Sequence, residues 1–206
     1  MQEKELKNLD RHEFIRISLK KLNIMAVCKL AKDILKSTAC GYSLKQIVDL
    51  YLANYEDITA STIGKPTEGD GVEVKTITLA PEAKFYHIEP AKDTATFTDS
   101  LQVGDGGSKY RQTEITWNIA GSYTSNMVDI LDALSLGRYA IVARLSDGSY
   151  VMFGRLTPLE ATVASLTSAA EATGFNGITV TFQNSTVESP LPLSAEAIQT
   201  VLGQGK

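Results

Sequence analysis

The chain offers few residues that could carry out acid–base or nucleophilic chemistry. Its two histidines are His12 and His87. His12 lies in a charge-rich N-terminal segment where solvent exposure is expected. His87 lies in the strand-like run Phe85–Ile88, where a hydrogen-bonded structural role is expected. Neither is accompanied by a serine or cysteine in the sharp turn of a nucleophile elbow, so nucleophilic catalysis is not expected.

A glycine-rich segment, Gly104–Ser108, superficially resembles a phosphate-binding loop. It lacks the Lys-Ser/Thr ending of a P-loop, and the pattern that follows it predicts a strand where a P-loop requires a helix. We therefore interpret it as the tip of a hairpin.

The remaining candidates for chemistry are acidic residues and cysteines. Asp93, Asp99 and Asp105 could hold a cation, but their spacing fits no calcium loop. Two pairs of neighbouring carboxylates lie on predicted loops: Glu56 with Asp57, and Glu68 with Asp70. Both pairs are expected to be solvated. Cys28 and Cys40 are too few for a four-ligand zinc site or a disulfide framework. We expect no catalytic residue, no metal site and no cofactor, and the protein is not expected to be an enzyme.

Bulk composition narrows the class of protein. The 206 residues include 43% hydrophobic and 21% charged residues, which is typical of a globular chain. The net charge of −4 provides no basic surface for gripping nucleic acid and suits a surface past which nucleic acid slides. No apolar run approaches the roughly 18 residues of a membrane span. The N-terminus lacks the apolar core of a signal peptide, so synthesis in a cytoplasm is expected, with Met25 an alternative start.

The elements that must position any site are clearest between Tyr110 and Phe153. Residues 112–119 alternate: Thr113, Ile115, Trp117 and Ile119 share one face of a predicted strand, and Gln112, Glu114, Thr116 and Asn118 share the other. A helix is predicted at Asn126–Leu136, capped by Thr124 or Ser125 and ended by a left-handed Gly137. Two further strands, Arg138–Leu145 and Ser149–Phe153, are expected to pair across an Asp147-Gly148 turn.

Short strands are predicted along most of the remaining chain. They cover 47–52, Val72–Leu79, Lys84–Ile88, Thr94–Leu101, Ala161–Leu166 and Gly177–Gln183. Thr59–Gly71 is predicted as a loop. The fold class is mainly β, a sandwich or barrel-like domain over residues 41–188 with one flanking helix at 126–136. A helical, amphipathic N-terminal arm is predicted at 1–40, and a C-terminal arm with a short amphipathic piece at 189–206.

This order of elements resembles the tail-tube proteins of tailed bacteriophages. Three short sequence segments are similar to segments of structural proteins from phages that infect Bacteroidetes. They are Cys40-Gly41-Tyr42-Ser43, Leu50–Asn54 and Asn176–Phe182. The resemblance implies a virion structural protein, assembled in the host bacterial cytoplasm. It implies a homo-oligomer of stacked rings, commonly of six subunits, around a channel that DNA crosses without sequence readout. The hairpin Phe97–Gln112 and the terminal arms would then join subunits, and other tail or neck proteins would be partners.

Two alternatives stay open from the sequence. The long segment before Cys40 also suits a neck, baseplate or capsid-associated phage protein. A β-sandwich binding module is the second alternative, and it predicts a cluster of exposed aromatic residues on one face, such as Tyr51, Tyr55, Tyr86 and Tyr110.

Overall fold

The computed structural model describes residues 46–67, 71–121, 124–169 and 174–203, all within one structural unit, Tyr42–Lys206. The predicted N-terminal arm, with His12 and both cysteines, lies outside the described residues, as do Glu68 and Asp70. The described part contains the strands β1 (Ile47–Asn54), β2 (Ile58–Gly64), β3 (Glu73–Leu79), β4 (Tyr86–Ile88), β5 (Thr96–Val103), β6 (Lys109–Ala120), β7 (Arg138–Leu145), β8 (Tyr150–Phe153), β9 (Leu159–Thr167), β10 (Gly177–Thr186) and β11 (Leu191–Pro192). Its helices are α2 (Ser125–Leu136), α3 (Ala195–Val201) and the 3₁₀ turn η1 (Tyr55–Asp57).

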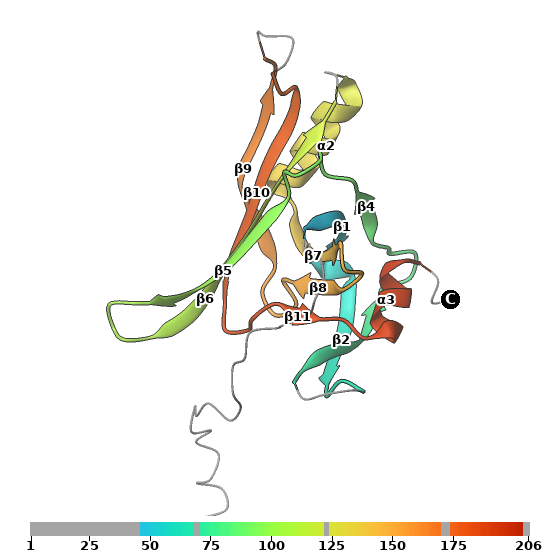
Figure 1. Cartoon of the computed structure of the whole chain (residues 1–206), viewed down its shortest axis with the longest axis vertical. Helices are drawn as coiled ribbons and strands as arrows, with labels where there is room; N and C mark the ends of the chain where they lie inside the picture. Colours follow the sequence, from blue (N-terminus) through green and yellow to red (C-terminus); the bar gives the residue numbers. More distant parts are fainter. Residues whose placement is uncertain (1–45, 68–70, 122–123, 170–173, 204–206) are drawn as a thin grey trace, which may run out of the picture. The chain divides into compact units, whose positions relative to one another are not determined.

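Nine of the strands form one large antiparallel sheet (Figure 1). Seven follow the order β11-β8-β7-β9-β10-β6-β5, β1 pairs with β7 in addition, and β4 pairs with the other side of β1. β7 is the branch point. It pairs with β1 along one side, and on the other side its first residues pair with β9 and its later residues with β8. β2 and β3 form a separate two-stranded sheet. The prediction of a mainly β chain is confirmed.

The middle of β7 is apolar because both of its faces are covered there. Successive side chains of a strand point to opposite faces. Ile141 therefore belongs to one core cluster, with Trp117 of β6 and Phe182 of β10. Val142 belongs to a second cluster, with Val74 of β3. This double burial explains why residues 139–143 form a continuous apolar run without alternation.

The single helix predicted near the middle of the chain is confirmed as α2. Thr124 is its N-cap, and the Thr124 hydroxyl accepts a hydrogen bond from the Met127 backbone N–H at 3.4 Å. Met127 and Leu134 are buried on the face turned to the core. α2 lies next to β9.

The expected role of Gly137 is wrong. Its backbone is extended, with φ −81° and ψ 162°, because the chain passes directly from α2 into β7. Its N–H still bonds to the carbonyl of Ala133 at 2.9 Å. A Cβ at this position would lie 2.2 Å from the Tyr139 hydroxyl oxygen, which itself donates to the Ala133 carbonyl. The position therefore requires the absence of a side chain and does not require a left-handed backbone.

Both predicted tight turns are confirmed. Between β5 and β6, the Gly104 N–H donates to the Ser108 carbonyl at 2.9 Å, and Gly107 has φ +77°. Between β7 and β8, Gly148 has φ +84° and its N–H donates to the Leu145 carbonyl at 2.9 Å. Left-handed backbone at these two glycines is what the turns demand.

The loop prediction for Thr59–Gly71 is wrong in its first half, where the chain forms β2. β2 pairs with β3, and the hydroxyls of Thr62 and Thr76 lie 2.6 Å apart across the pair. None of the β2 side chains is fully buried, so the strand has no alternation by which the sequence could have revealed it.

The chain after Ser189 packs within the same unit. β11 pairs with β8, and α3 begins at the N-cap Ser194, whose hydroxyl accepts from the Ala197 N–H at 3.3 Å. Ala197 and Val201 of α3 are buried in the second core cluster. The described part of the expected C-terminal arm is therefore a covering element of this sheet.

Candidate assembly surface

The outer face of β9, β10, β6 and β5 is polar. Thr116 of β6 is directly opposite Thr96 of β5 and Thr181 of β10, and Thr181 is opposite Val163 of β9, so these side chains share one face. We call this the polar face. Its members are Thr96, Thr98, Ser100, Gln102, Tyr110, Gln112, Glu114, Thr116, Asn118, Glu160, Val163, Ser165, Thr167, Thr179, Thr181, Gln183 and Ser185.

Hydroxyl and carboxamide groups dominate the polar face. Glu114 and Glu160 are the charged members among these described residues, and none is lysine or arginine. Cross-strand hydrogen bonds tie the surface together: the hydroxyls of Thr116 and Thr181 lie 2.9 Å apart, and Gln183 Nε2 donates to Glu114 Oε2 at 2.9 Å. Such a surface presents hydrogen-bonding groups but no cation that would retain a phosphate.

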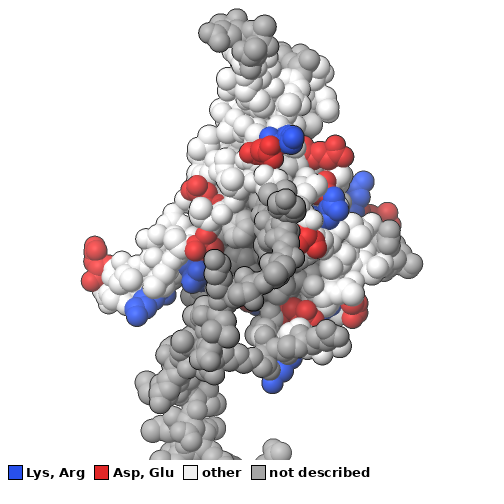
Figure 2. Space-filling view, viewed as in Figure 1, with Lys and Arg blue, Asp and Glu red and all other residues white. Residues whose placement is uncertain are grey.

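The reverse side of β6 is buried, as its alternation predicts. Thr113 is 3% exposed, and Ile115 and Trp117 are fully buried. On the face of the molecule drawn in Figure 2, the acidic and basic side chains of the described residues are interspersed, without a large patch of one sign.

The hairpin formed by β5 and β6 continues past the end of β10. β6 pairs with β10 as far as Arg111 opposite Thr186, whereas its pairing with β5 continues to Lys109 opposite Val103. In Figure 1 this distal end extends clear of the neighbouring strands. Leu101 and Val103 on β5 are 56% and 60% exposed. Apolar side chains at these exposures are available for contact with another molecule.

Among the described strands, β5 also forms an edge of the large sheet, paired on one side only. In an antiparallel pair, alternate residues direct both backbone polar groups towards the partner strand, and the others direct them away. Gly104 directs its N–H towards Ser108 on the partner side. Counting back along the alternation, the residues whose backbone groups point away from β6 are Phe97, Asp99, Leu101 and Val103. β5 contains no proline, no lysine and no bulge, which are three of the features that block an edge, and its one charged residue, Asp99, is neutralised by Arg111.

A carboxylate inside the hairpin holds its two strands together. Asp99 accepts hydrogen bonds from Arg111 Nε at 2.7 Å and from the Thr113 hydroxyl at 3.1 Å. Its side chain is 11% exposed. The hydrogen bond to Asp99 raises the pKa of Arg111. Sequence reasoning missed this network and placed Asp99 only in a possible cation site; its place among the alternating residues of β5 was the available signal.

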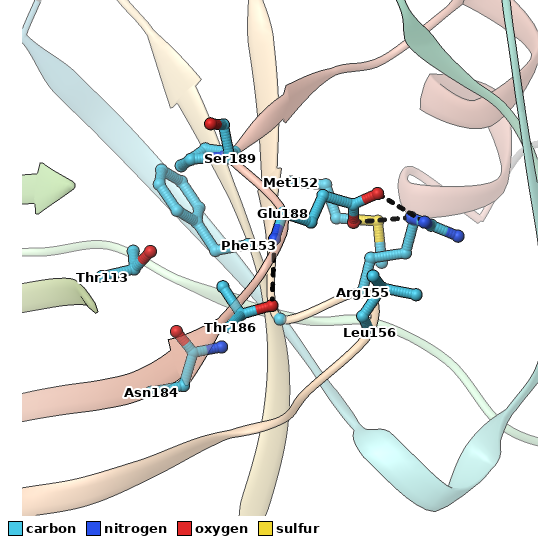
Figure 3. Close-up of a pocket in the computed structure, with 11 residues that line it drawn as sticks. Thr113, Met152, Phe153, Arg155, Leu156, Asn184, Thr186, Glu188 and Ser189 are labelled. Carbon is cyan, nitrogen blue, oxygen red and sulfur yellow. Dashed lines mark hydrogen bonds and ion pairs between the residues drawn. The ribbon is translucent and has the colours of Figure 1, made fainter. Parts of the chain in front are cut away.

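Cavities near the hairpin are small. Figure 3 shows the space at its base, lined by side chains that include Thr113, Phe153 and Asn184 and bordered by the facing pair Arg155 and Glu188. Its volume is about 10 Å³, and Arg155 forms a two-pronged ion pair with Glu188 beside it.

Two wider depressions lie elsewhere on the described surface. One, of about 470 Å³, lies where β6, β9 and β10 end, and no titratable side chain lines it. The other, of about 750 Å³, runs between residues 77–84 and the end of α3, and its charged side chains Glu82 and Lys84 are both exposed. Neither depression combines a base with a nucleophile.

His87 is held in a polar cluster on β1, β4 and β7. Its Nε2 lies 3.0 Å from Asp49 Oδ1, and Arg144 Nε lies 2.5 Å from Asp49 Oδ2. The ring of Tyr51 stacks on the imidazole at 5.0 Å. Burial alone would raise the pKa of Asp49, but the hydrogen bonds from His87 and Arg144 outweigh it and lower that pKa. No hydroxyl or thiol of the described residues is hydrogen-bonded to this imidazole. The cluster joins β1, β4 and β7 through the carboxylate of Asp49.

The three aspartates considered for a cation are not brought together. Asp99 is bound within the hairpin, while Asp93 and Asp105 are exposed in turns. Within the described residues no group of three or more potential ligands gathers.

The loop carboxylates have structural partners. Glu56 forms an ion pair with Arg138, and Asp57 accepts a hydrogen bond from Asn54 Nδ2 at 2.9 Å. These contacts tie η1 to the start of β7 and to the end of β1.

The tyrosines expected to share one face in a binding module lie apart. Tyr86 is opposite Leu52 across β1 and β4, so it is on the face opposite to Tyr51. Tyr110 belongs to the polar face of the hairpin. Tyr55 lies in η1 and its hydroxyl donates to the carbonyl of Leu156 at 2.8 Å. No aromatic platform of these four residues forms.

Comparison with known proteins yields no match to a protein-family model, to a curated protein or to a solved structure. No helix among the described residues is long and apolar enough to cross a membrane.

Proposed function

We propose that this protein is a virion structural protein, a bacteriophage tail-tube subunit that self-assembles into stacked rings around a channel for DNA. Its role is non-catalytic, and it is assembled in the host bacterial cytoplasm. Its domain is a β-sandwich whose two core clusters lie on opposite faces of β1 and β7.

The polar face is the observation that carries this proposal. DNA is retained on proteins chiefly by Lys and Arg on its phosphates, and each such contact adds affinity. The polar face carries hydroxyls, carboxamides and two carboxylates, and none of its members is a cation. Such a surface would let DNA pass without retaining it. As the lining of a ring, this face would confine DNA and leave its sequence unread.

The hairpin and the β5 edge supply the contacts that a ring needs. Outward backbone groups of Phe97, Leu101 and Val103 offer hydrogen bonds to a neighbouring copy, and the side chains of Leu101 and Val103 offer apolar area. The outward carbonyl of Asp99 already accepts from the Arg111 side chain at 3.4 Å. The Asp99 network holds the hairpin in shape before assembly, which lowers the entropy cost of association.

Electron microscopy of the purified full chain at high concentration tests the proposal. Rings of constant diameter, or tubes built from them, are the expected result. A strictly monomeric and monodisperse species at every concentration and salt condition would rule the proposal out. Aggregates without a repeating ring would also count against it.

A further inference from the structure

We propose that one ordered water molecule binds at the base of the β5–β6 hairpin and links β10 to that hairpin. The inference concerns the fold of a single subunit, so it stands or falls independently of the tail-tube proposal.

Asn184 on β10 has a buried acceptor without a hydrogen-bond partner among the described residues. The residue is 8% exposed, and its Nδ2 donates to the carbonyl of Thr157 at 2.7 Å. Its Oδ1 is buried and receives no hydrogen bond from the part of the chain that the structure describes. The amide cannot be turned over, because two acceptors would then face each other at 2.7 Å. A buried acceptor of this kind costs about 1–3 kcal/mol if nothing satisfies it.

The small cavity beside Asn184 has the size of one water. Its volume is about 10 Å³, close to the ~10–15 Å³ that a single water requires. Figure 3 shows the Asn184 carboxamide oxygen turned to the side of this space on which Thr113 and Phe153 lie. An organic ligand does not fit there.

Hydroxyl groups complete the coordination of such a water. Thr113 is directly opposite Asn184 across β6 and β10, and its hydroxyl proton is committed to Asp99, so its oxygen can accept. Thr186, two residues after Asn184 on the same face, lines the same cavity. Its hydroxyl oxygen accepts from the Glu188 N–H at 3.4 Å and its proton is free to be donated. The water would donate to Asn184 Oδ1 and to the Thr113 hydroxyl, and it would accept from the Thr186 hydroxyl. These bonds match the ~3 hydrogen bonds usual for buried water.

The water completes a chain of hydrogen bonds across four segments. The chain begins at Asp99 on β5, passes through Thr113 on β6 and Asn184 on β10, and ends at the Thr157 carbonyl between β8 and β9. This polar row separates the apolar core from the exposed end of the hairpin, and it fixes the direction in which the hairpin leaves the sheet.

Protein–water cross-relaxation in solution NMR on the full chain tests the site. We expect long-lived water cross-peaks at the Asn184 side-chain amide protons, and an ordered water within about 3 Å of Asn184 Oδ1 in a high-resolution map. Thr186→Val should keep the fold and weaken those cross-peaks. Thr179→Val, which removes a hydroxyl from the polar face, should leave them unchanged.

Two results would overturn the inference. One is the absence of both cross-peaks and ordered density at Asn184 in the wild type. The other is Asn184→Leu raising the melting temperature, which would mean that the space is an unfilled apolar gap. Should Asn184→Leu fail to fold, the wild-type spectrum alone decides.

Discussion

Asp49 joins three strands through a single carboxylate. It accepts from His87 on β4 and from Arg144 on β7, while its own side chain is 12% exposed and both partners are more than one-third exposed. The arrangement resembles part of a catalytic triad in composition. Without a nucleophile bonded to the imidazole, it fastens the short strand β4 to the sheet.

Asp49→Asn is expected to lower the free energy of unfolding at neutral pH by about 1–2 kcal/mol, because charged hydrogen bonds are lost at a site that solvent partly screens. Although burial opposes it, the hydrogen bonds from His87 and Arg144 hold the folded pKa of Asp49 below its ordinary value of 3.8. The stabilisation of the fold by the Asp49 carboxylate is therefore fully present above pH 3.8, and it is lost as pH falls through the lower, folded pKa. Chemical denaturation between pH 2 and 7 measures it.

Asp105→Asn at the exposed hairpin tip is the matched control, with no expected change. If the deficit of Asp49→Asn is equally large at pH 2 and pH 7, the carboxylate pairing is not its source.

Gly177 occupies a position where any side chain would strain the backbone. Its φ is +149°, and a Cβ there would lie 2.0 Å from the backbone oxygen of Ile119. Gly177→Ala is expected to destabilise the protein by more than about 1 kcal/mol in thermal or denaturant unfolding. Gly106→Ala, where a Cβ meets nothing within 4 Å, should be close to neutral. Equal stability of the two variants would contradict the close approach of β6 and β10.

At the scale of elements, β5 has two different sides. On one side its backbone pairs with β6 and so stabilises the subunit. On the other side its backbone pairs with no other described strand. Proline substitution separates the two, because proline removes one N–H and is tolerated at sheet edges.

Leu101→Pro removes an outward N–H and is expected to leave unfolding unchanged while abolishing ring formation, as measured by sedimentation and microscopy. Ser100→Pro removes an inward N–H and should destabilise the fold itself. Leu101→Thr keeps the N–H and shortens the apolar side chain, so it separates the contribution of the strand edge from that of the side chain. If Leu101→Pro assembles like the wild type, the β5 edge is not an interface.

At the scale of the whole molecule, the lining of the proposed channel can be given charge. Thr96→Lys with Thr98→Lys adds two cations to exposed positions of the polar face. Assembled particles of this variant are expected to retain duplex DNA at low salt and to release it as salt rises, whereas wild-type particles retain none. Filter binding across a salt series measures the difference.

Ala195→Lys with Gln199→Lys on α3 is the control, since it adds the same charge to exposed positions away from the polar face. Equal retention by both variants would mean that the polar face does not enclose the DNA.

Much of the local structure followed from the sequence. The alternation of Thr113, Ile115 and Trp117, the glycine turns and the cap Thr124 each depend on residues close together in the chain, so strand faces, hairpins and α2 could be predicted. β2 could not, because its side chains are buried on neither face and its pairing with β3 supplies its order.

Tertiary structure alone decided the rest. That β7 is covered on both faces, that β5 pairs on one side only among the described strands, and that Asn184 keeps an acceptor unmatched by the described residues all depend on which distant strands become neighbours. Gly137 is the smallest example: the sequence shows a glycine after a helix, but only the fold brings the Tyr139 hydroxyl to the place where a Cβ would stand. Periodicity is a property of one segment, whereas contacts between segments are set by packing, which no single segment contains.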